Sequence, residues 1–147
     1  MPALTLTLTQ FVDFDGDGDV AVGEQADIVG RCRYRAPMLS FQKLDVYQRA
    51  IEFLALAAQI STDVPRGNAP LLDQLRRASC SVSLNIAEGR TGTADAARTY
   101  AIARGSAMEC AAVLDALLIL KVVSASTHQR GIEILERIVA MLTKLCR

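Results

Sequence analysis

The stretch Gln74-Leu-Arg-Arg-Ala-Ser-Cys-Ser-Val-Ser-Leu-Asn-Ile-Ala-Glu-Gly89 decides the fold of this chain. Its apolar residues recur at intervals of three and four, which predicts a helix over about residues 71–88. The predicted core residues of this helix are Leu75, Ala78, Val82 and Ile86. Small and polar side chains stand where an ordinary amphipathic helix carries Leu or Lys, so this helix needs a specific partner surface. Gly89 is expected to end it in a left-handed conformation.

Three further segments have the same periodicity. The first spans about residues 43–61, and its expected apolar face is Leu44, Tyr47, Ile51, Leu54 and Ala58. The third is expected to start at Thr93 as N-cap, with Asp95 in its first turn, and to run to about Lys121. Its expected core residues are Tyr100, Ala103, Ala107, Cys110, Leu114 and Leu117. The fourth follows a break at Ser124–Thr127 and uses Ile132, Leu135, Val139 and Leu142.

Four helices with short connections pack antiparallel, so the predicted fold is an all-α, up-down-up-down four-helix bundle over residues 38–147. The length of 147 residues suits one domain, and 51% apolar with only 5% aromatic residues favours aliphatic helix packing. Residues 1–37 lack helical periodicity and are expected to be an irregular N-terminal extension, with Met38 as the natural initiator.

Charge and cysteine usage exclude several classes of protein. Residues 1–37 hold three basic and six acidic residues, and residues 38–147 hold 13 basic and 10 acidic ones. An excess of +3 is well below that of a dedicated nucleic-acid binder. Four dispersed cysteines without Cys-x-x-Cys spacing predict no zinc site, and no cofactor is expected. No apolar run is long enough to span a membrane, so the cytoplasm is the expected location.

One N-terminal motif has the spacing of a calcium-binding loop. Its candidate ligands are Asp13, Asp15, Asp17, Asp19 and Glu24. Oxygen ligands at these intervals can surround one hard cation. The motif lacks the flanking helices of a calcium-binding hand, so the interpretation favoured here is a chance match.

A polar stripe runs beside the apolar face of the second helix. It consists of Gln74, Arg77, Ser81, Asn85 and Glu88. The third helix carries Gly105, which is unfavourable by about 1 kcal/mol relative to Ala and suggests that another backbone passes close by. The favoured interpretation is a structural polar network of Asn85, Glu88, Arg104, Ser106 and Glu109 that sets helix register. The alternative is an active site with Glu88 and Glu109 as an acid–base pair, but no nucleophile or metal pair accompanies them.

The segments Asn85-Ile-Ala-Glu-Gly89 and Ala103-Arg-Gly-Ser106, followed by Glu109, resemble the four-helix-bundle family named for reading frames in intervening sequences of bacterial 23S rRNA genes. The resemblance covers about residues 41–146. It implies a four-helix bundle, no established enzymatic activity and assembly into homopentamers. Related accessory proteins of diversity-generating retroelements bind a reverse transcriptase and nucleic acid through a basic pentamer.

The expected function is therefore that of a non-enzymatic, oligomeric scaffold or binding protein. Its expected partners are copies of itself and RNA, DNA or a nucleic-acid-handling protein. The candidate nucleic-acid contacts are Arg76, Arg77, Arg90 and Arg98. A ring repeats a weak basic patch in every subunit and so strengthens its binding. The alternative is a protein-binding structural oligomer without affinity for nucleic acid.

Overall fold

The computed structural model describes residues 39–63, 66–92 and 95–146. Four long helices make up nearly all of this part of the chain: α1 (Asp45–Asp63), α2 (Ala69–Gly89), α3 (Ala96–Ile119) and α4 (Ala125–Leu145). Two short 3-10 helices, η1 (Ser40–Lys43) and η2 (Arg66–Asn68), precede α1 and α2. No strand occurs in these ranges. The expected all-α class is confirmed.

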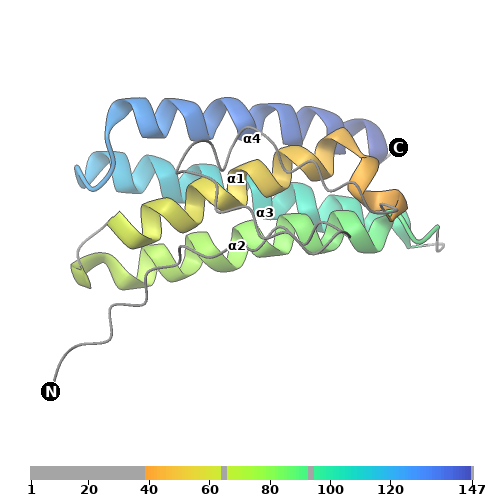
Figure 1. Cartoon of the computed structure of the whole chain (residues 1–147), viewed down its shortest axis with the longest axis horizontal. Helices are drawn as coiled ribbons and strands as arrows, with labels where there is room; N and C mark the ends of the chain where they lie inside the picture. Colours follow the sequence, from red (N-terminus) through yellow and green to blue (C-terminus); the bar gives the residue numbers. More distant parts are fainter. Residues whose placement is uncertain (1–38, 64–65, 93–94, 147) are drawn as a thin grey trace, which may run out of the picture. The chain divides into compact units, whose positions relative to one another are not determined.

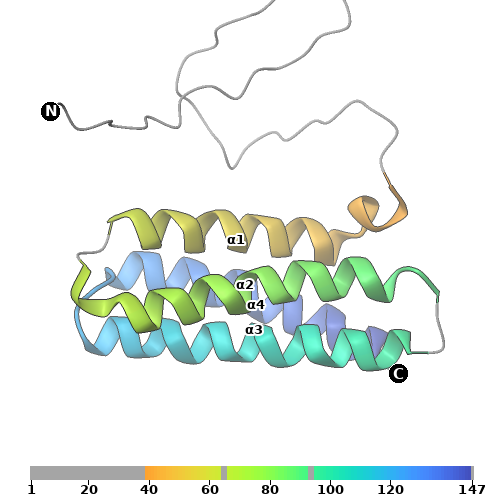
Figure 2. The ribbon, with the colours of Figure 1, turned by 90° about the horizontal axis from the view of Figure 1, so that it is seen from below.

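Successive helices run in opposite directions and lie side by side (Figure 1). Each helix contacts two neighbours: α1 and α3 each pack against both α2 and α4, and α3 packs most extensively against α2. Within the described residues the diagonal pairs, α1 with α3 and α2 with α4, make no contact. Figure 2 shows from a second side that α1 and α3 lie at opposite edges of the bundle, with α2 and α4 between them. The chain therefore forms the expected four-helix bundle.

Local sequence explains the start of α4 and the end of α3. Ser124 caps α4, since its Oγ accepts a hydrogen bond from the Thr127 backbone N–H (3.1 Å). After α3, Lys121 has a φ of 57° and the Val122 N–H donates to the Leu117 carbonyl (2.8 Å), which completes a Schellman motif. Asp95 is the N-cap of α3 rather than part of its first turn, and the expected cap Thr93 lies outside the described residues.

The core faces of α2 and α3 are as predicted. Each predicted core residue of these two helices is at most 7% exposed. In α4, Leu135 and Leu142 are buried, whereas Ile132 and Val139 are only half-buried. The centre of the α4 core face also includes Ile134 and Ile138.

The predicted apolar face of α1 is wrong. Ile51 is 39% exposed and Ala58 is also exposed, while Leu44, Tyr47 and Leu54 are half-buried. The buried face consists of Val46, Ala50, Phe53, Leu56, Ala57 and Ile60. α1 has apolar residues on two adjacent faces, so its periodicity fits either one. Burial of the large Phe53 ring, which is 1% exposed, selects the face that points inward.

Two glycines allow close packing that the sequence did not reveal. A Cβ at Gly131 would lie 2.6 Å from Leu114 Cδ1, so this glycine lets α4 approach α3. A Cβ at Gly89 would lie 2.6–2.9 Å from three ring carbons of Tyr100. Gly89 is the last residue of α2 and is not left-handed, so the expectation of a left-handed stop there is wrong. The left-handed residue is Gly92, with φ of 76°.

Candidate functional site on α2 and α3

A hydrogen-bonded polar cluster joins α2 to α3. Ser81 Oγ and Ser106 Oγ are 2.9 Å apart, and this pair spans the two helices. Asn85 Nδ2 donates to the Ser81 carbonyl (2.8 Å) and to Ser81 Oγ (3.1 Å). Ser106 is buried, while Ser81 and Asn85 are half-buried. Small side chains let the two helices come close enough for hydroxyl groups to bond directly.

A second cluster lies further along the same pair of helices. The Gln74 amide donates to the Glu109 carboxylate across the helices, and Arg77 donates to the Gln74 side-chain oxygen. Glu109 and Arg77 are exposed. This cluster includes Gln74, which belongs to the polar stripe predicted on α2 but not to the predicted network.

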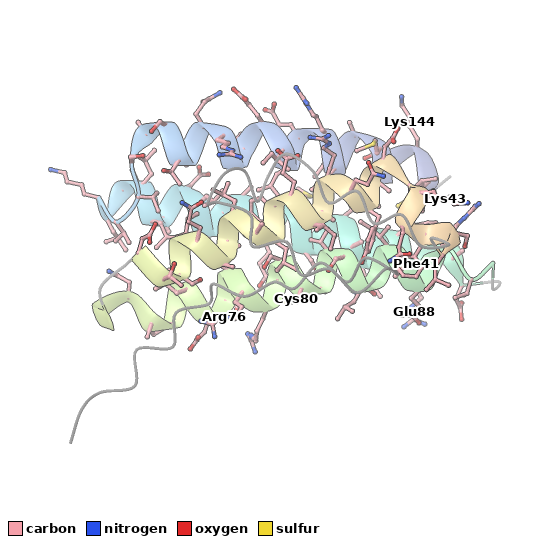
Figure 3. The ribbon with its side chains drawn as sticks, in the orientation of Figure 1. Phe41, Lys43, Arg76, Cys80, Glu88 and Lys144 are labelled. Carbon is pink, nitrogen blue, oxygen red and sulfur yellow. The ribbon has the colours of Figure 1, made fainter. Side chains whose placement is uncertain are left out.

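The predicted network is thus divided. Asn85 and Ser106 meet through Ser81, and Glu109 belongs to the separate Gln74 cluster. Within the described residues, the side chains of Glu88 and Arg104 make no hydrogen bond or ion pair. Figure 3 shows Glu88 at the end of α2 that lies towards η1. The side-chain spacing along α2 indicated the cross-helix contacts, but only the packing of α3 shows which stripe members take part.

The candidate acid–base pair is not assembled. Glu88 and Glu109 are both exposed, and no hydrogen bond connects them in the described part of the chain. Two surface pockets, of about 280 and 420 Å³, lie between α1 and α4, and neither is lined by Glu88 or Glu109. Over the described ranges, no group of three or more His, Cys, Asp or Glu side chains is placed to hold a metal ion. The candidate calcium ligands Asp13 to Glu24 lie outside the described residues.

All four candidate arginines are exposed. Arg76 forms a surface ion pair with Asp73, in which Nη1 lies 3.8 Å from Oδ1. The Arg76 side chain points away from the bundle (Figure 3). Arg77 is held by Gln74. Arg90 and Arg98 form no ion pair with any described carboxylate. Arg90 and Arg98 are therefore available to a partner. Arg76 is accessible as well, because an exposed ion pair such as the one with Asp73 is weak.

The sequence interpretation of Gly105 is wrong for the single chain. Gly105 is exposed, and a Cβ built there would meet nothing within 4 Å. The predicted close backbone is therefore not part of the bundle. Gly105 instead lies on the outer side of α3, beside the exposed residues Ile102 and Met108.

The three described cysteines are free thiols. Cys110 is buried between the helices, and Cys80 and Cys146 are half-buried. Burial, assisted by the nearby Glu109 charge, raises the pKa of the Cys110 thiol from 9.0 to about 12. This thiol is protonated at neutral pH and therefore is no nucleophile.

None of the described helices combines the length and the apolar composition needed to cross a lipid bilayer.

Comparison with known proteins gives matches of two kinds, to a sequence family and to solved structures. The sequence model of the 23S rRNA-intervening sequence protein family matches residues 42–144. The bundle also superimposes on the crystal structure of a protein of unknown function from the S23 ribosomal protein family of Bacteroides thetaiotaomicron VPI-5482, with a TM-score of 0.65 and 18% identity. That match covers 69% of this chain and 98% of the other. No curated protein matches the chain.

Proposed function

The chain belongs to the 23S rRNA-intervening sequence protein family, and from this premise we propose that it is a non-enzymatic, self-assembling binding protein. Its proposed partner is RNA, bound directly or together with an RNA-handling protein. The observation that supports this proposal is the group of exposed arginines on the adjacent helices α2 and α3. Guanidinium groups pair with phosphate oxygens, and such contacts do not depend on nucleotide sequence.

Assembly is an essential part of the proposal. A single bundle presents few arginines, and its excess of positive charge is small. A ring of five copies, which the family resemblance implies, would present the patch five times to one nucleic-acid strand. Linked weak contacts bind far more strongly than each contact alone, because the later ones form at high effective concentration. The three free thiols are consistent with a reducing compartment, and we place the protein in the cytoplasm.

The test is binding of the full chain to single-stranded RNA and to DNA at two salt concentrations, with the particle mass measured by light scattering. Binding that falls steeply as salt rises is expected, because each neutralised phosphate releases counterions. The Arg76→Ala/Arg90→Ala variant should bind more weakly and with a smaller salt slope. Arg130→Ala/Arg137→Ala on α4 removes the same charge from another helix and should bind like the unaltered chain.

A defined oligomer that ignores both nucleic acids would contradict the RNA proposal. It would support the alternative of a structural oligomer that binds only protein. Equal weakening by both arginine pairs would show non-specific attraction by net charge and would remove α2 and α3 as the contact surface.

A further inference from the structure

The outer side of α3 carries a regular exposed stripe. It consists of Arg98, Ala101, Gly105, Met108, Ala112 and Asp115, all of them exposed. These residues follow one another at intervals of 3, 4, 3, 4 and 3, which is the seam spacing of a two-helix coiled coil. We call this set the outer stripe. Figure 2 shows α3 along one edge of the bundle, with no other described helix beyond it.

The outer stripe is apolar between its charged ends, and large exposed apolar residues flank it. Met108 is 60% exposed, and the neighbouring Ile102 and Ile119 are 47% and 81% exposed. The opposite side of α3 is fully buried in the bundle, at Ala103, Cys110 and Leu114. Large apolar side chains that gather on an exposed helix face commonly mark a surface that another molecule covers. Among the described residues, only the inner side of α3 is covered.

The stripe is complementary to itself when reversed. Counted from the midpoint between Ser106 and Ala107, Arg98 and Asp115 are equally distant, and so are Ala101 and Ala112. Gly105 and Met108 are the innermost such pair. In an antiparallel coiled coil, each a position of the heptad lies opposite a d position of the partner helix. Arg98, Gly105 and Ala112 occupy a positions, and Ala101, Met108 and Asp115 occupy d positions, so all three pairs have this arrangement. The outermost pair, Arg98 with Asp115, has opposite charges. The next pair consists of two alanines, and the central pair places the long Met108 side chain beside the open space at Gly105.

The central pair matches in shape. A Cβ at Gly105 would have nothing within 4 Å, so the glycine leaves an open space on the helix surface. Met108 is a flexible, apolar side chain that adapts to such a space. In the reversed pairing, Met108 of each helix lies over Gly105 of the other. This gives Gly105 the close neighbour that its own bundle does not provide.

The terminal pair matches in charge. Arg98 has no ion-pair partner among the described residues. In the paired copies it would contact Asp115 in place of a phosphate, which leaves Arg76, Arg77 and Arg90 for the proposed RNA contact. Asp115 accepts a hydrogen bond from His128 Nε2 through one carboxylate oxygen (2.7 Å), yet its side chain remains 66% exposed. Its carboxylate can therefore receive a guanidinium while it still contacts His128.

We propose that α3 pairs antiparallel with α3 of a second copy of this chain, about a twofold axis between Ser106 and Ala107. This pairing gives a specific surface to the self-association proposed above, and it rests on that proposal. From Arg98 to Asp115 the contact is roughly 26 Å long, at about 1.5 Å per helical residue. A twofold contact joins copies in pairs. Particles that contain it hold an even number of copies, two if it acts alone and ten if it joins two rings of five.

The first experiment measures the particle mass of the full chain and its variants by light scattering. The unaltered chain should have an even number of copies, and Gly105→Leu should halve the mass because the leucine occupies the space meant for Met108. Arg98→Asp alone should also halve it. The double variant Arg98→Asp/Asp115→Arg should restore the mass, because the opposite charges are exchanged. Ile51→Ala, an exposed apolar residue on α1, is the matched control and should leave the mass unchanged.

The second experiment tests the direction of the pairing. A mixture of Ala101→Cys and Ala112→Cys chains should form a disulfide between copies on mild oxidation. Ala101→Cys alone should not, because two copies of residue 101 would be roughly 16 Å apart along the paired helices, beyond the reach of a disulfide. The unaltered chain under the same oxidant controls for the native thiols.

The outcomes separate this inference from the proposed function. A pentamer or other particle whose mass is the same in all variants overturns the α3 pairing and leaves self-association intact. Cross-linking of Ala101→Cys with itself also overturns the antiparallel pairing. A monomeric unaltered chain overturns both the pairing and the proposed assembly.

Discussion

The two sides of α3 have nearly the same kind of sequence and opposite surroundings. The inner side holds Ala103, Ala107 and Cys110, each 0% exposed, and the outer side holds Ala101, Met108 and Ala112, all exposed. Small apolar residues at helical spacing therefore mark a packing surface without saying what packs on it. The inner side meets α2 and α4 of the same chain. The outer side has the same chemistry and is available to another molecule.

Glycines repeat this contrast. Gly131 packs against Leu114 inside the bundle, and a Cβ at Gly105 would meet no other described residue within 4 Å. The sequence pointed to Gly105 as the close contact and did not single out Gly131. A glycine within a helix thus signals a close neighbour, but that neighbour can belong to the same chain or to another.

The largest expected difference between the inner and outer sides of α3 is in the loss of unfolding free energy when a long side chain on each side is shortened to alanine. Leu114→Ala should lower the free energy of unfolding by about 2–5 kcal/mol, because it leaves a cavity in a fully buried site. Met108→Ala should change the stability of the separate chain by less than about 0.5 kcal/mol. Urea unfolding at low protein concentration measures both. Equal losses would show that the outer side is buried within the monomer.

The two glycines should respond to leucine with opposite signs. Gly131→Leu should destabilise the bundle by about 1–3 kcal/mol or more, because even its Cβ overlaps Leu114. Gly105→Leu should stabilise the separate chain by about 0.5–1 kcal/mol, since leucine favours the helix and meets no neighbour. Thermal unfolding of the two variants side by side is the measurement. A loss of stability for Gly105→Leu in a monomeric sample would contradict the open position assigned to it.

A smaller effect is expected at the polar cluster between α2 and α3. Asn85→Ala should lower the free energy of unfolding by about 0.5–1.5 kcal/mol, because it removes the bonds to Ser81 at a half-buried site. Glu88→Ala is the matched control on the same helix, and its exposed side chain has no described partner. Chemical denaturation of both variants measures this difference. Indistinguishable unfolding midpoints would mean that the Asn85 contacts do not stabilise the bundle.

The last prediction concerns an effect that appears only at high pH, at the Cys110 thiol on the inner side of α3. Its pKa is raised to about 12, so the folded state holds this proton more tightly than the unfolded state does. The stability associated with the neutral thiol is complete below pH 9 and is lost as the pH rises towards 12. Thiol labelling at pH 8 should leave Cys110 unmodified in the folded chain and modify it after unfolding. Rapid labelling of Cys110 in the folded state would show that it is accessible.

Much of the fold could be predicted from the sequence, and the reason differs between helices. In α2, small and polar residues interrupt the apolar pattern, so only one face can be buried. In α3, the buried face carries the larger apolar residues, such as Tyr100, Leu114 and Leu117. Every core residue predicted in these two helices is correct. In α1, two adjacent faces are apolar, and the periodicity does not distinguish Ile51 from Phe53. Helix periodicity determines which residues share a face, and packing against α2 and α4 determines which face turns inward.

The site was less accessible to sequence reasoning. The stripe from Gln74 to Glu88 was visible because helix geometry alone places its members in line. Its contacts with Ser106 and Glu109 depend on how far α3 is shifted along α2, and the spacing within each helix contains no information about that shift. For the same reason, Glu88 and Arg104 were expected in a network that does not include them.

Local periodicity and residue type were enough to predict four helices, an all-α bundle and the chemical character of each helix side. The tertiary structure decided which apolar side is core, which glycine is a close contact and which polar residues meet. Those facts depend on the distances between helices that are separate in the chain. The outer stripe of α3 depends on both kinds of information. Its residue pattern is visible in the sequence, but only the fold shows that no other helix of the bundle covers it.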